Sequence, residues 1–201
     1  MKDMGRNPRA PWTRQLDLLE IDGEKDAITD NGTENWNLLE QHGVKNVILL
    51  GVHTNMCVLG RPFGLRQMAR NGKNVVLMRD LTDTMYNPEM EPKVSHFQGT
   101  DLIVEHIEKY VCPTVKSSKI LNGSSFKFRN DKRPKILFLI GEREYLTSKT
   151  LPKYADSNLL SKYRVDFLFA ADGQSDFGDI HSEISDADLL FLSVRRRALS
   201  D

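Results

Sequence analysis

The feature that most constrains this chain is a series of short apolar runs separated by segments with helical spacing. The runs lie at 47–52, 74–78, 136–140, 165–170 and 188–194. A continuous apolar run of strand length is typical of a strand that is buried on both faces of a sheet. Strands that alternate with helices over short connections pair in parallel through right-handed crossovers. The sequence therefore predicts an α/β fold.

The segments between the runs predict where helices begin and end. Helices are expected at 30–43, 95–110, 151–162 and 177–185. Asn31 or Thr33 should cap the first of them. The segment after Cys57 also has helical spacing, but Pro62 lies inside it and should kink the helix or delay its regular start. A loop that contains Asp80 and Asp83 is expected after the run at 74–78.

The predicted elements fall into two α/β blocks, at 1–113 and 135–201. The stretch between them, 114–134, is polar and basic. A basic patch for nucleic acid and a solvated interdomain linker both fit this composition, and the scarcity of aromatic residues favours the linker. The second block has too few elements to cover a parallel sheet on both of its faces.

Composition argues against several classes of function. The chain has 28 basic and 28 acidic residues, so we expect no attraction to nucleic acid or to an anionic membrane. No apolar run approaches the roughly 20 residues that span a bilayer, and residues 1–7 lack the apolar core of a secretory signal. Two distant cysteines do not make a disulfide framework, so a cytoplasmic location is expected. The histidines lack metal-ligand spacing and the glycines form no phosphate-binding fingerprint, so we expect neither a metal nor a cofactor.

Cys57 is the candidate catalytic residue. It follows the apolar run at 47–52 and opens a segment with helical spacing. At such a junction, backbone N–H groups and the helix dipole stabilise a thiolate, and the same N–H groups can hold an oxyanion. Sites in open α/β sheets also form at the carboxyl ends of strands. The alternative is a small buried thiol without a chemical role, which is what most free cysteines are.

The stretch GVHTNMCV at 51–58 resembles the nucleophile motif of the isochorismatase-like cysteine hydrolases. The resemblance covers residues 16–113. It implies a three-layer parallel sheet and hydrolysis of a C–N bond in a small amide or carbamoyl compound through a Cys57 acyl-enzyme. It also implies a cis peptide bond between Val52 and His53, and an oxyanion hole made by the backbone N–H groups of His53 and Cys57.

The catalytic set of that family also contains an aspartate and a lysine, which this chain does not match. No apolar strand that ends in aspartate precedes Cys57, and Asp17 lies in too short a context. Asp22 stands where the lysine is expected, and Lys25 is out of register. We therefore expect that the N-terminal part of the domain is missing or that the site is divergent. Because the aspartate handles a proton transfer worth about 10²–10⁴-fold, the chain alone is expected to be inactive, and its open sheet edge prone to aggregate.

Residues 135–201 resemble the opening of a ThuA-like domain, which has a class I glutamine-amidotransferase-like, flavodoxin-like fold. The resemblance lies in ILFLIGE at 136–142, in Tyr145 and in DLLFLSVRRR at 188–197. It implies a partial α/β domain that continues beyond this chain. The arginines at 195–197 follow a strand, where they suit an anionic ligand, a solvated loop or a salt-bridged turn.

Two functions remain open on the sequence alone. One is a cysteine hydrolase that acts on a small-molecule substrate. The other is a non-catalytic α/β module that provides a binding or assembly surface, and a homo-oligomer is compatible with either. Asp80, Asp83 and His96 are candidates for lining a pocket beside Cys57, although helix capping and loop hydrogen bonds are the simpler explanation. Cys112 is expected to be a structural thiol.

Overall fold

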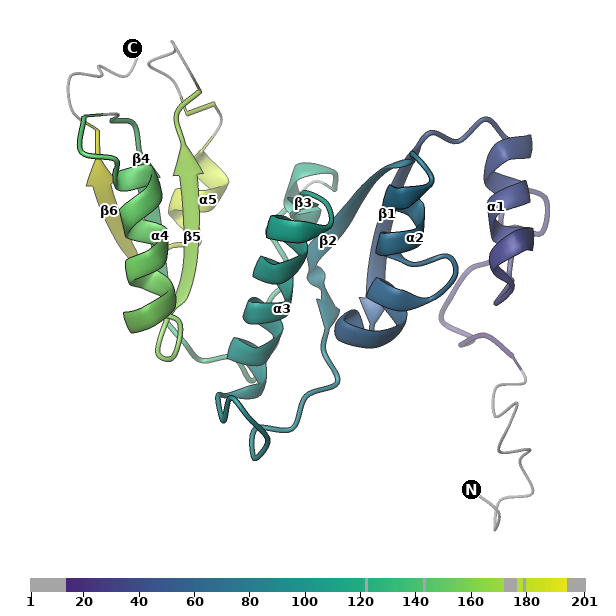
Figure 1. Cartoon of the computed structure of the whole chain (residues 1–201), viewed down its shortest axis with the longest axis horizontal. Helices are drawn as coiled ribbons and strands as arrows, with labels where there is room; N and C mark the ends of the chain where they lie inside the picture. Colours follow the sequence, from purple (N-terminus) through teal and green to yellow (C-terminus); the bar gives the residue numbers. More distant parts are fainter. Residues whose placement is uncertain (1–13, 122, 143, 172–176, 179, 195–201) are drawn as a thin grey trace.

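The computed structural model describes residues 14–121, 123–142, 144–171, 177–178 and 180–194 of the chain. These residues form a mixed α/β structure with two separate parallel sheets of three strands each (Figure 1). The strand order is β1-β2-β3 in the first sheet and β5-β4-β6 in the second. Every strand pair in both sheets is parallel. The predicted α/β class and parallel pairing are confirmed.

The first unit contains the strands β1 (Asn46–Val52), β2 (Asn74–Asp83) and β3 (Thr114–Val115) and the helices α1 (Gly32–Gln41), α2 (Leu65–Arg70) and α3 (His96–Tyr110). Asn31 caps α1 by accepting hydrogen bonds from the backbone N–H groups of Thr33 and Glu34. A π-helical turn, η2 (Thr54–Val58), precedes α2. Regular helix resumes only after Pro62, as the position of the proline predicts.

The hydrophobic core of the first unit lies on one face of its sheet. Trp36 of α1, Met68 of α2 and Ile107 of α3 pack into the same cluster as Leu77 of β2. These helices therefore cover a common side of the strands.

The opposite face of β1 is open. The side chains of Ile48, Leu50 and Val52 are 44%, 52% and 63% exposed. The prediction that this strand is buried on both faces is therefore wrong for the described chain. The reason is that β1 lies at the edge of its sheet and alternate side chains point away from the helices that cover the other face.

β2 is longer than its apolar run. It continues to Asp83, so Asp80 and Asp83 lie in the strand and the prediction of a loop there is wrong. Pairing with β1 resumes after an irregularity between Leu49 and Gly51, and it matches Val52 with Asp83. Backbone pairing, which does not depend on apolar side chains, extends the strand.

The connecting segment, residues 114–134, is largely exposed, but part of it contacts the first unit. It begins with β3, which pairs with β2, and its Ser117 and Asp131 side chains are buried. The Asp80 carboxylate accepts hydrogen bonds from the backbone N–H groups of Ser117 (2.8 Å) and Phe126 (2.9 Å), and from the Ser117 hydroxyl. The polar residues of this segment are ordered because they find polar partners in the first unit.

The second unit contains the strands β4 (Lys135–Ile140), β5 (Arg164–Phe169) and β6 (Leu189–Ser193) and the helices α4 (Thr147–Asn158) and α5 (His181–Ser185). The central strand β4 is buried along its whole length. The Phe138 ring lies 5.0 Å from that of Phe167 and 4.9 Å from that of Phe191. Leu189 and Leu192 of the edge strand β6 are each 56% exposed, consistent with too few elements to cover both faces. The arginines at 195–197, and part of the segment predicted as helix at 177–185, lie outside the described residues.

Partly buried ion pairs join the two units through the connecting segment. The Lys116 ammonium of the connecting segment lies 2.6 Å from the Asp166 carboxylate of β5, and Lys135 of β4 lies 3.2 Å from the same carboxylate. Arg133 contacts Asp101 of α3 at 2.7 Å. α3 lies between the first sheet and the second unit (Figure 1). No helix in the described part of the chain combines the length and apolar character that a membrane crossing requires.

Candidate functional site

Cys57 lies in η2, immediately beyond the carboxyl end of β1. Its side chain is half-buried and its thiol is free. The turn is closed by the His53 carbonyl, which accepts hydrogen bonds from the backbone N–H groups of Met56 (3.1 Å) and Val58 (3.2 Å). The resemblance implies a cis bond between Val52 and His53, and the structure has a cis bond there.

A buried pair of threonines fixes the base of this turn. The Thr54 side chain is fully buried, and its hydroxyl oxygen lies 2.5 Å from that of Thr82 on β2. The Thr82 hydroxyl donates to the Gly51 carbonyl at 2.8 Å. Because a hydroxyl has a single proton, Thr54 must be the donor to Thr82. The turn is thus tied to the neighbouring strand directly before Cys57.

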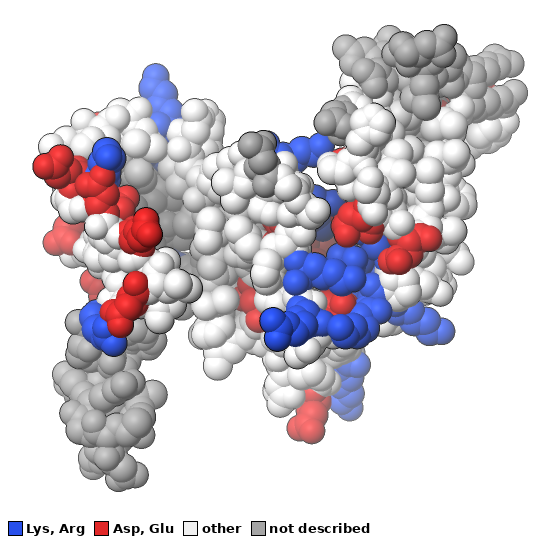
Figure 2. All heavy atoms as spheres, turned by 180° about the vertical axis from the view of Figure 1, so that it is seen from behind, with Lys and Arg blue, Asp and Glu red and all other residues white. Residues whose placement is uncertain are grey.

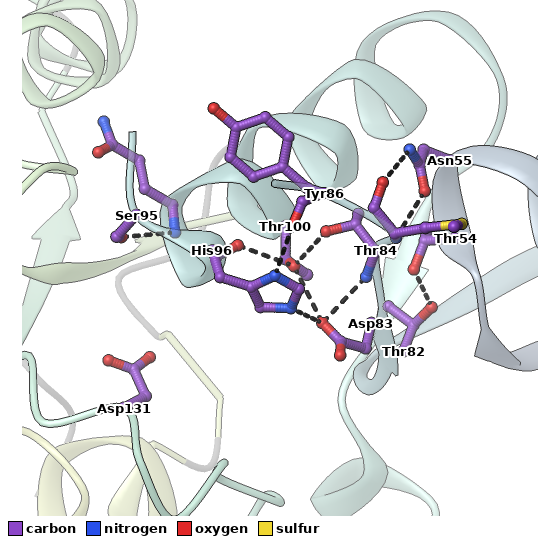
Figure 3. A network of polar contacts seen from close by, with 12 residues as sticks. Thr54, Asn55, Thr82, Asp83, Thr84, Tyr86, Ser95, His96, Thr100 and Asp131 are labelled. Carbon is purple, nitrogen blue, oxygen red and sulfur yellow. Dashed lines mark hydrogen bonds and ion pairs between the residues drawn. The ribbon is translucent and has the colours of Figure 1, made fainter. Parts of the chain in front are cut away.

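Asn55 ties the same turn to the segment after β2. Its side-chain NH₂ donates to the Met85 carbonyl at 3.1 Å, and its side-chain oxygen accepts from the Met85 backbone N–H at 3.0 Å. The amide therefore pairs with the backbone in the way that a neighbouring strand does (Figure 3). Sequence reasoning assigned no role to Thr54, Asn55 or Thr82, although the short polar residues directly before Cys57 were the available indication.

The Asp83 carboxylate is the centre of a polar cluster at the end of β2 (Figure 3). One of its oxygens accepts hydrogen bonds from the Thr84 backbone N–H (3.0 Å) and the Thr100 hydroxyl (3.2 Å), and contacts Nε2 of His96 at 2.8 Å. The other ring nitrogen, Nδ1, lies 3.1 Å from the Tyr86 carbonyl. Burial lowers the pKa of His96, but its bonds to the Tyr86 carbonyl and the Asp83 carboxylate outweigh burial and raise that pKa above its ordinary value.

The structure brings Asp83 and His96 together, but it does not bond either of them to the Cys57 thiol. Within the described residues, no hydrogen bond or ion pair reaches Sγ of Cys57. Asp80 faces the connecting segment, as the simpler explanation by loop hydrogen bonds predicts.

Asp17 and Lys25, whose sequence positions do not match the expected catalytic residues, bond to local partners. Asp17 pairs with Arg14, and Lys25 lies 2.6 Å from Asp22. Both pairs join residues three positions apart on an exposed part of the chain. These contacts do not direct either side chain toward Cys57.

Cys112 has the surroundings expected of a structural thiol. It is 7% exposed and lies in the core cluster of the first unit. Burial raises the pKa of its thiol, because a thiolate is poorly solvated there.

A cavity of about 110 Å³ lies between the two units, away from Cys57. Cations and anions both line it, and they are largely paired: Lys116 with Asp166, and Arg133 with Asp101. Figure 2 likewise shows lysine and arginine side chains gathered on one face with acidic side chains among them. Because the charges compensate, this cavity offers little net attraction to a polyanion.

Comparison with known proteins identifies no relative: no family model, no curated protein and no solved structure matches this chain.

Proposed function

We propose that this chain carries the nucleophile region of an isochorismatase-like cysteine hydrolase, which cleaves a C–N bond of a small amide or carbamoyl compound. The observation that carries the proposal is the position of Cys57: half-exposed, in a helical turn directly beyond the carboxyl end of a parallel strand. The buried Thr54 and the Asn55 amide fix that turn in place, as a nucleophile requires. We further propose that the first unit belongs to a three-layer domain and that the second unit belongs to a flavodoxin-like, ThuA-like domain.

In the proposed reaction, the Cys57 thiolate attacks the carbonyl carbon of the substrate. Backbone N–H groups of His53 and Cys57 hold the oxyanion of the tetrahedral intermediate. The C–N bond then breaks, the amine leaves with a proton, and water hydrolyses the thioester to release the acid and restore the thiol. Proton transfer in these steps needs an acid and a base, and within the described residues none is bonded to the thiol. We therefore propose that acylation by an activated donor is faster in this chain than turnover of an unactivated amide.

The second candidate is a non-catalytic α/β module that serves as a binding or assembly surface. One observation favours it: the titratable groups in the polar cluster near the turn, Asp83 and His96, bond to each other and to backbone. In this arrangement the histidine and the carboxylate stabilise a loop, and that role requires no reactive cysteine.

The two candidates differ in what happens at Cys57. The purified chain is incubated with primary amides, with N-carbamoyl amino acids and with an activated thioester, while ammonia release and protein mass are followed. The hydrolase proposal predicts an acyl adduct on Cys57 from the thioester, which Cys57→Ser abolishes and Cys112→Ser retains, and little ammonia release from the unactivated amides. If Cys57 forms no adduct and the Cys57→Ser variant is indistinguishable from the parent, the non-catalytic module is the correct reading.

A further inference from the structure

The His96 imidazole is held between two hydrogen-bond acceptors. Nε2 lies 2.8 Å from the Asp83 carboxylate and Nδ1 lies 3.1 Å from the Tyr86 carbonyl. Neither partner carries a proton to donate when Asp83 is ionised, so both ring nitrogens must donate. A neutral imidazole has one N–H only. The contacts seen in Figure 3 therefore belong to the doubly protonated ring.

The segment that His96 holds is also the segment that holds the Cys57 turn. Tyr86, whose carbonyl accepts from the ring, directly follows Met85. The backbone of Met85 makes both of its hydrogen bonds to the Asn55 side chain, two positions before Cys57. A short path of hydrogen bonds thus connects the imidazole to the turn that carries the thiol.

We infer that His96 is a positioning residue for the Cys57 turn and that it acts only while its imidazole is doubly protonated. When the ring loses a proton, a nitrogen lone pair faces either the carbonyl or the carboxylate, and one of the two hydrogen bonds is lost. The Met85–Tyr86 segment then keeps the Thr84–Thr100 hydroxyl contact with α3 but loses one of the two hydrogen bonds at His96, so the backbone partner of Asn55 is held less firmly. The inference rests on the proposed function only in treating the Cys57 thiol as the reacting atom.

Few other groups face the ring. Among the described residues, Asp83 is the charged group bonded to the ring, whereas Thr100 and the Phe97 ring, at 5.8 Å between centroids, are neutral. The Tyr86 hydroxyl bonds to the Met90 carbonyl. Asp131, which appears in the same view in Figure 3, is paired with Arg133. The protonation of His96 is therefore governed mainly by Asp83 and the Tyr86 carbonyl.

The test follows the rate at which iodoacetamide alkylates Cys57 between pH 5.5 and 8.5, in a Cys112→Ser background, beside an NMR titration of the His96 ring. In the parent, the rate should show an added inflection at the pH where His96 titrates. His96→Gln should remove that inflection and alkylate about fivefold faster than the parent at low pH, since about one net hydrogen bond no longer holds the segment. His106→Gln, on the same helix, is the matched control and should leave the profile unchanged.

Asp83→Asn provides a second variant. The amide oxygen still accepts a hydrogen bond, but the charge that favours the imidazolium is gone, so the inflection should move to lower pH together with the NMR titration of His96. Superimposable profiles for the parent and His96→Gln, or an unmoved inflection in Asp83→Asn, overturn the inference. Both readouts are independent of acylation and hydrolysis, so a Cys57 that forms no acyl adduct contradicts the proposed function and leaves this inference standing.

Discussion

At the scale of single residues, the two cysteines have opposite surroundings. Cys57 is half-buried in a turn beyond the end of a strand. Cys112 is 7% exposed in the core cluster, and burial raises the pKa of its thiol. Reaction with an alkylating reagent requires both access and a thiolate. The two thiols therefore differ in reactivity for reasons of packing alone.

We predict that iodoacetamide at neutral pH modifies Cys57 at least about tenfold faster than Cys112, because the Cys112 thiol becomes accessible only through local unfolding. Mass spectrometry of tryptic peptides, sampled over time, measures the two rates. Addition of guanidinium chloride to unfold the chain should bring the rates together. Equal rates in the folded chain would contradict the burial of Cys112.

At the scale of elements, α1 combines a side-chain cap with partial packing, since Trp36 and Leu39 contact the core cluster of the first unit. It contains no fully buried residue. Its contacts with the rest of the unit include the Lys73 ammonium, which lies 4.8 Å from the centroid of the Trp36 ring. The Asn31 side chain satisfies two backbone N–H groups at the start of the helix. A helix with so little buried surface is sensitive to the loss of a cap.

We predict that Asn31→Ala lowers the free energy of unfolding by about 1 kcal/mol, since it leaves the first N–H groups of α1 without a side-chain acceptor. Asn31→Asp is the matched control and should keep the stability of the parent, because aspartate also caps a helix and suits its dipole. Urea unfolding followed by tryptophan fluorescence measures both variants. An equal loss in both would mean that the amide of Asn31, and not its acceptor oxygen, matters.

At the scale of the whole molecule, Asp166 is the charge that joins the two units. Its side chain is 18% exposed and lies between Lys116 of the connecting segment and Lys135 of β4. Burial raises the pKa of Asp166, but Lys116, Arg79 and Lys135 outweigh burial and hold that pKa well below its usual range. The folded state therefore favours the ionised carboxylate. Stability from this group is present above pH 4 and is lost as the pH falls below about 4.

We predict that Asp166→Asn lowers the free energy of unfolding at pH 7 by about 3 kcal/mol, since it leaves Lys116 without its counter-charge and leaves Lys135 with Asp186 alone. The difference between the variant and the parent should shrink below about pH 4, because the unfolded parent then binds a proton that the folded parent, with its lowered Asp166 pKa, takes up only at lower pH. Glu89→Gln, at an exposed position, should change stability by less than about 0.5 kcal/mol. Denaturant titrations at pH 7 and at pH 3 measure all three proteins. If the difference in unfolding free energy between the parent and Asp166→Asn does not depend on pH, the carboxylate charge does not stabilise the fold.

The sequence predicts the elements whose pattern is local. The apolar runs predict β1, β2, β4, β5 and β6, and Asn31, one of the two caps predicted for α1, is the residue that caps it. The local pattern does not predict three features: the strand β3, the extension of β2 to Asp83, and the contacts that order the connecting segment. Each of these depends on a partner that is distant in the sequence, such as Asp80 for Ser117. Polar residues that find such partners have the same local pattern as solvated ones.

The same difference between local and long-range information applies to the candidate site. The amino-acid pattern predicts that Cys57 lies shortly after a strand in a segment with helical spacing, because strand length and the position of Pro62 are local properties. Only the tertiary structure decided that Asp83 and His96 bond to each other and to the segment that holds Asn55, and that one face of β1 lies open. The physical reason is that hydrogen-bond partners and burial depend on which elements lie side by side. That arrangement is settled by packing between segments that are far apart in the chain.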